Sequence, residues 1–453
     1  MTSPGGARES ALRALIKIDE GSVYAGQARN RVLRFYNLPI QERAFCTKLI
    51  FGVTKYKKAI DYVLGAFSSR PVQNMDPIVK NTLRLGVYQI LYMREIPDYA
   101  AVNESVTLVK SLGHPGKAKF VNAVLRSVSR KTDAIIFPDP SRDWVSHIAV
   151  KYSHPEWLVS RWIKRFGPEG TINLCLENNK EARIVVRTNT LKITREDLIK
   201  ELDQQGFGPY PSNLVDEGIE LRNAGGLFNT GLYLEGFFFV QGTASMLVSH
   251  VLSPEPGDEI LDLTAAPGSK TTHIAELIGD KGRIVACDMH EHRLALIKDN
   301  AERLGLSSVE FIRCDSRRLP KDIKATKFDK VLLDAPCSGT GVLRKKADLR
   351  WRRIKNDINH IVTLQTGLLE SAANQVKPGG ILVYSTCSIE PEENEVLISD
   401  FLSRHPEFSY DYSQPFLPSG FKKAFQEQGR PYVITYPHIH GTDGFFIARL
   451  KHC

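Results

Sequence analysis

The first part of the chain repeats apolar residues at three- and four-residue spacing, which is the period of an amphipathic helix. Leu12, Leu15 and Ile16 fall on one helical face. The same spacing recurs in three further sets, namely Phe45, Leu49, Ile50 and Val53, then Val102, Val106 and Val109, and finally Phe120, Val121, Val124, Leu125 and Val128. Because little strand-like alternation separates these sets, the pattern predicts a small all-α bundle over residues 1–130.

The pattern changes after this bundle. Two prolines interrupt the next stretch, which indicates a linker. Residues 183–188 have the character of a strand, and Thr194 followed by Asp197 is typical of a helix start. Residues 131–235 are therefore predicted to form a linker and a small α+β module.

Short apolar runs alternate with helical stretches over residues 236–453. Runs of this length suit strands buried on both faces of a parallel sheet, and the alternation implies a doubly wound, Rossmann-like α/β fold. The predicted strands are residues 260–263, 283–288, 309–314, 331–334 and 381–385. Ligands of such sheets bind beyond the carboxyl ends of the strands, so the residues that follow each run are candidates for a site.

Composition adds a polyanionic partner to this picture. The 453 residues carry a formal net charge of +9, which favours nucleic acid ahead of an anionic membrane surface. No apolar run reaches the roughly 18 residues of a membrane span, and the N-terminus lacks the apolar core of a secretory signal. The seven cysteines form no CxxC pair. No disulfide framework and no metal site are therefore expected, and reduced thiols in a cytoplasm fit best.

The turn after the first of these strands contains several small residues. It runs from Asp262 to Lys270 and leads into a predicted helix. Small side chains let the backbone approach a ligand, and a helix N-terminus offers free N–H groups. Neither the dinucleotide-binding fingerprint nor the P-loop pattern is present. Taken alone, such a turn is equally typical of a structural loop.

Acidic residues lie at or directly after the ends of four consecutive predicted strands, namely Asp262, Asp288, Asp315 and Asp334. A carboxylate after the second strand binds ribose hydroxyls in nucleotide-binding α/β folds. One after the third strand can accept a hydrogen bond from an exocyclic amine. Each acid alone is typical of a solvated strand end, but four in succession predict one shared site for an adenosine-like ligand.

Two cysteines follow the fourth and fifth strands. Cys337 lies in the segment DAPCSGTG, residues 334–341, and Cys387 lies in the segment YSTCS, residues 384–388. A lone cysteine after a strand is usually a small buried residue. Two of them at neighbouring strand ends, beside a candidate ligand site, predict that both thiols face one cleft.

Two thiols and an acid in such a cleft suit methylation of a cytosine at carbon 5. Carbon 5 is too weak a nucleophile to take a methyl group unaided, and a thiolate that adds to carbon 6 activates it. An acid near N3 must neutralise the charge that develops, and Asp334 is placed for that role if it is protonated. Loss of the carbon 5 proton then expels the thiolate. The base must first leave its stack.

These segments resemble the RNA cytosine-5 methyltransferases, which have a nucleophilic cysteine in a TC motif and a second cysteine in a PC motif. The resemblance implies that Cys387 attacks the base and that Cys337 assists product release. It also implies S-adenosylmethionine as cofactor, bound by Thr264, Ala265, Ala266, Pro267, Gly268, Ser269, Lys270, Asp288, Asp315 and Asp334. The family usually has cysteine in place of Thr264 and glycine in place of Ser269, and serine is acceptable there if its φ is negative.

The resemblance extends over nearly the whole chain. Residues 1–130 resemble the NusB-like helical domain of the RsmB or Sun subfamily, and residues 153–157, 241–256 and 442–446 are similar to later segments of that subfamily. The subfamily methylates cytosine 967 of bacterial 16S ribosomal RNA. The resemblance implies a methyltransferase domain at residues 236–453 and ribosomal RNA as partner. We also expect a cytoplasmic monomer that needs no protein partner.

Two basic clusters, at residues 344–346 and 350–353, follow the Cys337 segment. Basic residues with an interleaved aromatic residue can bind phosphates and stack on a base. The same pattern also suits a solvated helix face. The position of the clusters beside the Cys337 segment favours RNA.

Three other functions stay open at this stage. A transfer RNA cytosine-5 methyltransferase would use the same chemistry; the helical N-terminal domain favours ribosomal RNA, but no motif specifies the target. A non-catalytic RNA-binding assembly factor is disfavoured because both cysteines and all four acids are intact. A redox pair of Cys337 and Cys387 is sterically allowed, but the surrounding motifs do not support it.

Overall fold

The computed structural model divides the chain into two compact units, each with cores of its own. The described residues are 6–412, 414–425 and 429–453. The first unit comprises residues up to 180 together with 343–355, and the second comprises residues 181–342 and 356–453. We call residues 343–355 the insertion segment. Residues 1–5 of the predicted helical domain lie outside the described residues. None of the described helices is long and apolar enough to cross a membrane.

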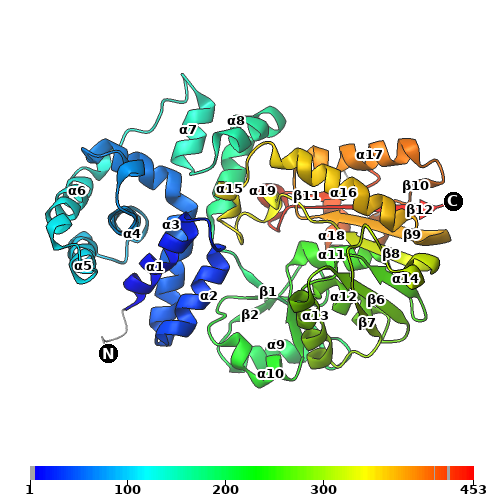
Figure 1. The fold of residues 1–453 in the computed structure, drawn as a ribbon. Coiled ribbons are helices and arrows are strands. Elements are labelled where there is room, and N and C mark those ends of the chain that lie inside the picture. The colour runs from blue at the N-terminus through cyan, green and yellow to red at the C-terminus, as the bar shows by residue number, and fades with distance from the viewer. Residues whose placement is uncertain (1–5, 413, 426–428) are drawn as a thin grey trace. The chain divides into compact units, whose positions relative to one another are not determined.

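Helices alone build the described chain from residue 6 to 130, as the periodicity predicts (Figure 1). They are α1 (Ala7–Asp19), α2 (Ala25–Tyr36), α3 (Ile40–Phe67), α4 (Pro77–Tyr92), α5 (Asp98–Ser111) and α6 (Ala118–Arg130), with short 3-10 turns between some of them. Asp76 caps α4 by accepting hydrogen bonds from the N–H groups of Ile78 and Val79. Leu49, Leu83 and other fully buried side chains fill the space between the helices. The all-α prediction is confirmed.

The insertion segment belongs to the first unit, which also contains α7 (Trp144–Lys151), α8 (Glu156–Asn179) and α15 (Leu349–Arg352). Arg350 is fully buried, and its Nη1 donates to Asn179 Oδ1 at 2.8 Å and to the carbonyl of Ser153 at 3.1 Å. The Trp351 indole donates to the carbonyl of Thr54 at 2.6 Å. The prediction that Arg350 binds RNA is wrong, because this side chain is buried and bonded within the protein. The Trp351 ring is half-buried, and its contact with RNA stays a prediction.

A small antiparallel sheet and two helices begin the second unit. The strands have the order β2-β3-β1-β4. The elements are β1 (Ile184–Thr188), α9 (Arg195–Gln204), β2 (Pro209–Pro211), β3 (Gly218–Leu221), α10 (Gly231–Leu234) and β4 (Phe238–Val240). Thr194 caps α9 by accepting from the N–H of Asp197, and Leu198, Leu202 and Phe238 are buried in the core of this module. The predicted α+β module is confirmed.

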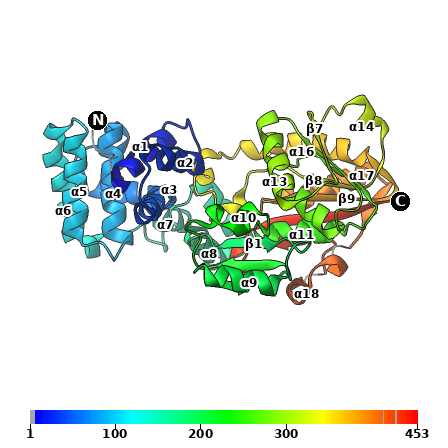
Figure 2. The same ribbon diagram turned by 90° about the horizontal axis from the view of Figure 1, so that it is seen from below.

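A mixed sheet of order β10-β12-β9-β8-β5-β6-β7, with β11 beside β12, forms the rest of the second unit (Figure 2). Its strands are β5 (Glu259–Asp262), β6 (Arg283–Asp288), β7 (Val309–Arg313), β8 (Phe328–Asp334), β9 (Val376–Thr386), β10 (Phe408–Tyr410), β11 (Val433–Thr435) and β12 (Phe445–His452). The predicted strands β5 to β9 are parallel. The sequence did not predict the antiparallel strands β10, β11 and β12.

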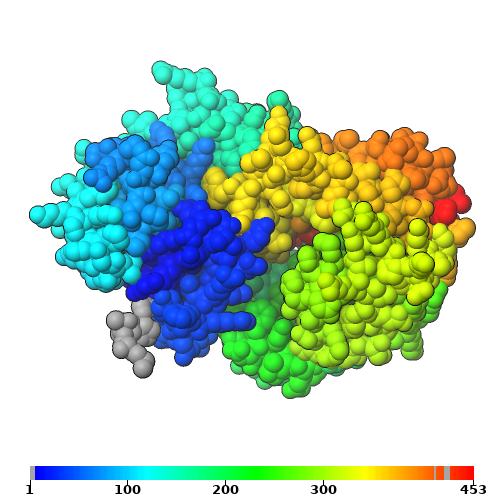
Figure 3. All heavy atoms as spheres, viewed as in Figure 1, coloured from blue at the N-terminus to red at the C-terminus, as the bar shows by residue number. Residues whose placement is uncertain are grey.

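Helices cover both faces of this sheet. Helices α11, α12 and α13 lie on one face, and α16 and α17 lie on the other (Figures 1 and 2). The bounds are α11 (Thr243–Leu252), α12 (Ser269–Leu277), α13 (Glu291–Leu304), α14 (Lys321–Ala325), α16 (Asp357–Ala373), α17 (Glu395–Arg404), α18 (Ser419–Phe425) and α19 (Pro437–His440). Little of the red C-terminal segment is visible in the space-filling view, because other parts of the chain cover it (Figure 3).

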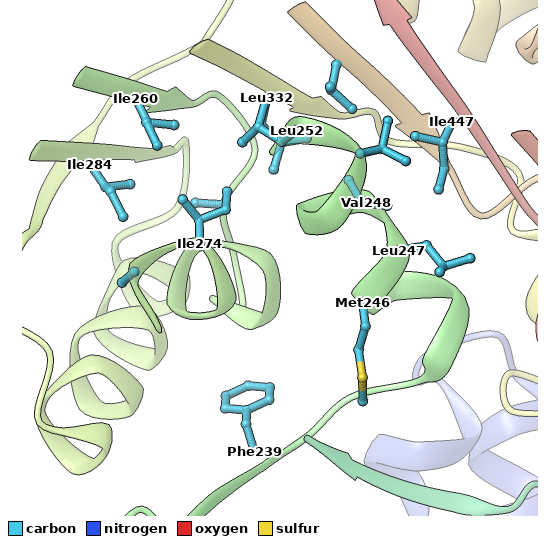
Figure 4. Close-up of a cluster of buried hydrophobic side chains, with 14 of the residues drawn as sticks. Phe239, Met246, Leu247, Val248, Leu252, Ile260, Ile274, Ile284, Leu332 and Ile447 are labelled. Atoms are coloured by element: carbon cyan, nitrogen blue, oxygen red, sulfur yellow. The ribbon is translucent and has the colours of Figure 1, made fainter. Parts of the chain in front are cut away.

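An apolar layer between α11, α12 and the strands anchors the sheet. Val248 of α11 and Ile274 of α12 are fully buried against Ile260, Ile284 and Ile447 of the strands (Figure 4). From β5 the chain adds β6 and β7 on one side and then β8 and β9 on the other. The strand order therefore reverses between β5 and β8, which is where ligands bind in doubly wound sheets.

Candidate active site

The structure brings the two predicted cysteines together. Cys337 follows β8 and Cys387 follows β9, and these neighbouring parallel strands pair in register as far as Asp334 and Ser385. The two Sγ atoms lie 3.1 Å apart, within hydrogen-bonding contact. Both side chains are half-buried. Two thiols that are 50 residues apart in sequence therefore form one site.

The two thiols have different surroundings. The hydrogen bond with Cys387 and burial raise the pKa of Cys337 well above its usual range, and the charges of Glu393 and Asp334 act in the same direction. Two thiols in contact do not ionise together. Cys337 therefore keeps its proton and can donate it to the sulfur of Cys387, which stabilises a thiolate there.

A buried carboxylate that the sequence analysis missed holds both cysteine loops. Glu393, at the end of the short helix η6 (Pro391–Glu393), is completely buried. It accepts hydrogen bonds from the N–H of Ser338 at 2.8 Å and from Oγ of Ser388 at 2.7 Å. Each of these serines directly follows one of the cysteines. The acidic run at residues 390–395 was the only sequence signal for this role.

Asp334 is one half of an ion pair. Its Oδ2 lies 2.7 Å from Nζ of Lys270, which the first turn of α12 supplies, and its Oδ1 accepts from Oγ of Ser385 at 2.8 Å. The hydroxyl of Thr264 donates to the backbone carbonyl of Asp334 at 2.9 Å. The ends of β5, β8 and β9 are thus tied together. The group predicted to act at N3 of a base is a lysine–aspartate pair rather than a lone acid.

Asp262 shapes the turn between β5 and α12. It is 1% exposed. Its Oδ2 accepts from Oγ1 of Thr271 at 2.7 Å, and its Oδ1 accepts from the N–H of Thr264 at 3.3 Å. Burial raises the pKa of Asp262 to about 6. Of the four acids at strand ends, Asp262 is the one whose two oxygens hold the turn and the start of α12 together.

The glycine and serine of this turn have the geometry that a close ligand approach needs. Gly268 has a φ of 98°, and a Cβ there would lie 3.0 Å from Cγ2 of Ile297. Ser269 is the first residue of α12, and its φ is negative. Serine is therefore acceptable at this position, because the negative φ that it requires is present. Ala265, Ala266 and Pro267 complete the turn at the carboxyl end of β5.

Asp288 is the last residue of β6, and Asp315 lies two residues after β7. Their carboxylates differ in burial and in hydrogen-bond partners. Asp288 is buried, and its Oδ1 accepts from the N–H of His290 at 3.0 Å. Asp315 is half-buried and receives two hydrogen bonds from the guanidinium of Arg317, which lower the pKa of Asp315. Asp315 must therefore share its oxygens with Arg317 when it binds a ligand. Together with the small-residue turn, these carboxylates at the reversal point of the sheet fit an adenosine-containing cofactor.

Three family profiles match successive parts of the chain. Residues 249–451 match the 16S rRNA methyltransferase RsmB/F family, residues 6–130 match the NusB family, and residues 154–227 match the ferredoxin-like domain of RsmF/B-like methyltransferases. A Bacillus subtilis protein named "Probable ribosomal RNA small subunit methyltransferase B" is 36% identical and covers 98% of each chain. The chain belongs to the RsmB/F family of methyltransferases.

Solved structures agree with RsmB/F membership. The crystal structure of PH0851 covers 98% of both chains with a TM-score of 0.81 and 32% identity. NSun6 from Pyrococcus horikoshii, solved with SFG, covers 66% of this chain and 98% of its own, with a TM-score of 0.59 and 27% identity. The family resemblance drawn from the sequence is confirmed, and with it the NusB-like, α+β and Rossmann-like fold classes. As an RsmB/F member, the chain is an S-adenosylmethionine-dependent RNA methyltransferase.

Proposed function

We propose that the chain transfers a methyl group from S-adenosylmethionine to carbon 5 of cytosine 967 in 16S ribosomal RNA, through a covalent adduct at Cys387. The observation that carries this proposal is the 3.1 Å contact between Cys337 and Cys387, at strand ends next to the Lys270–Asp334 ion pair. A methyltransferase that modified an exocyclic nitrogen would need neither thiol.

The first step is addition of Cys387 Sγ to carbon 6 of the flipped cytosine. A carbon–sulfur bond forms, and the electron pair of the carbon 5–carbon 6 double bond moves into the ring toward N3. The Lys270–Asp334 pair binds N3 and supplies the proton that neutralises this charge. Because Ser385 and Thr264 hold Asp334 from two sides, the pair stays in place without reorganising during the step.

S-adenosylmethionine, when bound, would supply the methyl group: the bond from its sulfonium to the methyl would break as the bond to carbon 5 forms, and S-adenosylhomocysteine would leave. The chain's own residues orient this cofactor. Asp288 is the proposed partner of the ribose hydroxyls, since its carboxylate lies at the end of β6 and is fixed by the N–H of His290. Asp315, with Arg317, is the proposed partner of the adenine amine. The turn from Thr264 to Lys270 provides the close backbone approach.

Product release reverses the addition. A base takes the proton of carbon 5, and the electron pair of the broken carbon–hydrogen bond reforms the double bond as the bond from carbon 6 to Cys387 Sγ breaks. N3 returns its proton to the Lys270–Asp334 pair. Cys337 assists this step because its thiol lies against the departing sulfur and can share its proton with the thiolate. Without that proton donor, the adduct would persist.

The ribosomal target is supported by the relatives rather than by any single side chain. The Bacillus subtilis relative named above is called a small subunit ribosomal RNA methyltransferase and matches this chain from end to end. The net charge of +9 suits a polyanionic substrate. The cytoplasmic location, the monomeric state and the domain limits at residues 130 and 235 stay predictions.

The test is methyl transfer to unmodified RNA with labelled cofactor, followed by mapping of the modified base. Purified protein is expected to place 5-methylcytosine at position 967 of 16S RNA, and a transcript with uracil at that position serves as the matched control. If the protein modified only transfer RNA, the proposed substrate would be wrong but the reaction would stand. The absence of 5-methylcytosine from both RNAs would refute the proposed reaction.

A further inference from the structure

Three side chains that the methyl transfer does not use meet inside the second unit. Glu217 lies just before β3 of the small module, His250 lies on α11, and His273 lies on α12. One carboxylate oxygen and one ring nitrogen from each histidine all lie within 4.8 Å of one another. Oε1 of Glu217 is 2.8 Å from Nε2 of His250 and 3.2 Å from Nε2 of His273.

His273 has no hydrogen bond to explain its burial. It is 1% exposed, and both of its ring nitrogens are buried without a hydrogen-bond partner, so Nε2 faces Glu217 outside hydrogen-bond geometry. A buried polar atom without a partner is unfavourable. A metal ion on Nε2 would give that atom a partner.

The distances between the three side chains suit shared ligands of one ion. Tetrahedral zinc, with bonds of about 2.0–2.1 Å, places neighbouring ligand atoms roughly 3.3 Å apart. Oε1 of Glu217 lies 3.2 Å from Nε2 of His273, which is close to that value. It lies 2.8 Å from Nε2 of His250, where a hydrogen bond joins the two atoms and an ion would take its place. Imidazole nitrogens of histidine are common ligands of zinc.

The charges around the three side chains do not oppose a cation. Arg187 is the nearby positive group, and it is fully buried and paired with Glu276 at 2.7 Å. Glu217 supplies a carboxylate, which is a ligand type that divalent cations accept.

We propose that Glu217, His250 and His273 bind one divalent transition-metal ion, zinc by the nature of the donor set, which fastens the small α+β module to α11 and α12. Imidazole and carboxylate ligands suit zinc, and three of them leave one position for water. The ion would also hold α12, whose first turn carries Lys270. The cysteine spacing predicted no metal site. The three ligands proposed here include no cysteine and lie far apart along the chain, so that spacing gives no sign of them.

The test uses the full-length chain without a polyhistidine tag, stripped with EDTA and titrated with Zn²⁺ or Co²⁺. Mass spectrometry of the metal content is expected to give about one zinc ion per chain. Bound Co²⁺ is expected to show the visible absorption of a tetrahedral ion, and Zn²⁺ is expected to raise the Tm. Glu217→Gln and His250→Gln should lose all three effects.

His405→Gln is the matched control. The His405 ring also contacts two carboxylates, at 2.7 Å from Glu370 and 2.9 Å from Glu407, but through its two different nitrogens, which cannot bind one ion together. This variant should keep the metal. The proposal is overturned if the wild-type chain binds neither ion and has the same Tm with Zn²⁺ and with EDTA, which would leave only a hydrogen-bonded cluster. Equal metal loss in His405→Gln would also overturn it.

Discussion

Glu393 places the two thiols more directly than any other single residue. Its carboxylate bonds the backbone of Ser338 and the hydroxyl of Ser388, so it fixes the chain immediately after both cysteines. It is buried and acts through these loops rather than on the base. A misplacement of about 1 Å in an active site can cost a hundredfold in rate.

Glu393→Ala is therefore expected to lower kcat by about a hundredfold while leaving the KM for RNA nearly unchanged. Glu393→Gln should recover much of the rate, because its amide oxygen still accepts from the N–H of Ser338. Steady-state kinetics on unmodified 16S RNA measure both values. If Glu393→Ala lowers only the Tm and leaves kcat intact, Glu393 stabilises the fold without positioning the thiols.

Asp262 gives a pH dependence whose sign can be worked out. Burial raises its folded-state pKa to about 6, above the unfolded value of about 3.9. The contribution of the protonated carboxyl is complete below the unfolded pKa and is lost as the pH rises through 6. Asp262→Asn does not titrate, so its free energy of unfolding relative to wild type should rise by about 2 kcal/mol between pH 4 and pH 7. Parallel pH profiles in urea denaturation would contradict this.

The residues that chemistry demands were predictable, and their partners were not. The two cysteines and the acids follow strand ends, and parallel strands bring such positions to one edge of the sheet. Lys270 pairs with Asp334, and Glu393 binds both serines, through contacts between segments far apart in sequence. No local pattern encodes a contact of that kind.

At the scale of elements, two glycines let the Cys337 loop cross the start of β12. A Cβ on Gly341 would lie 2.1 Å from the carbonyl oxygen of Gly444. The N–H of Gly341 donates to the carbonyl of Cys387 at 3.0 Å, and the N–H of Gly444 donates to the carbonyl of Gly341 at 2.8 Å. The crossing lies within residues 442–446, a segment that resembles the family.

Gly341→Ala is expected to lower the free energy of unfolding by about 1–3 kcal/mol and to slow methyl transfer, because the Cys337 loop must shift. Gly367→Ala is the matched control. Gly367 lies in α16, where a Cβ would come no closer than 3.9 Å to Cδ of Arg317, so it should be neutral or stabilise by up to about 1 kcal/mol. Equal denaturation midpoints and rates for the two variants would contradict the close approach.

Arg350 separates the two interpretations of the insertion segment. Its guanidinium satisfies the carbonyls of Ser153 and Asn178, and burial lowers its pKa only to about 10, so it stays charged. Arg350→Met is expected to cost about 3 kcal/mol of stability or more, with no change in RNA affinity of the folded protein. The side chain of Arg142 is 88% exposed, so Arg142→Met should leave stability unchanged. A loss of RNA affinity without a loss of Tm in Arg350→Met would restore the RNA-binding interpretation.

Elements were predictable where the local pattern is unambiguous. Buried parallel strands such as β6 and β8 form continuous apolar runs, and the helices of the first unit keep their period. The strand β12 joins the sheet through antiparallel pairing with β9. The residues of β12 alone do not predict this pairing. The basic and aromatic insertion segment has the composition of an RNA-binding stretch, and only its distant partners make it structural.

For the whole molecule, the proposed reaction requires different roles for the two cysteines. Cys387 forms the bond to RNA, and Cys337 helps to break it. The two sulfurs are 3.1 Å apart, so distance alone does not assign the roles. The family resemblance implies the roles, and the protonated form of Cys337 agrees with them: its hydrogen bond with Cys387 and burial raise its pKa well above the usual range, with the charges of Glu393 and Asp334 acting in the same direction. Exchanging the roles would leave the fold unchanged but would alter which variant holds RNA covalently.

The most direct measurement is therefore a denaturing gel of each cysteine variant after incubation with unmodified 16S RNA and S-adenosylmethionine. Cys337→Ala is expected to accumulate a slowly migrating covalent protein–RNA adduct. Without the proton donor Cys337, the Cys387 thiolate leaves carbon 6 only slowly. Cys387→Ala and the double variant are expected to form none and to transfer no methyl group. An adduct formed by Cys387→Ala, or methyl transfer by that variant, would contradict the account.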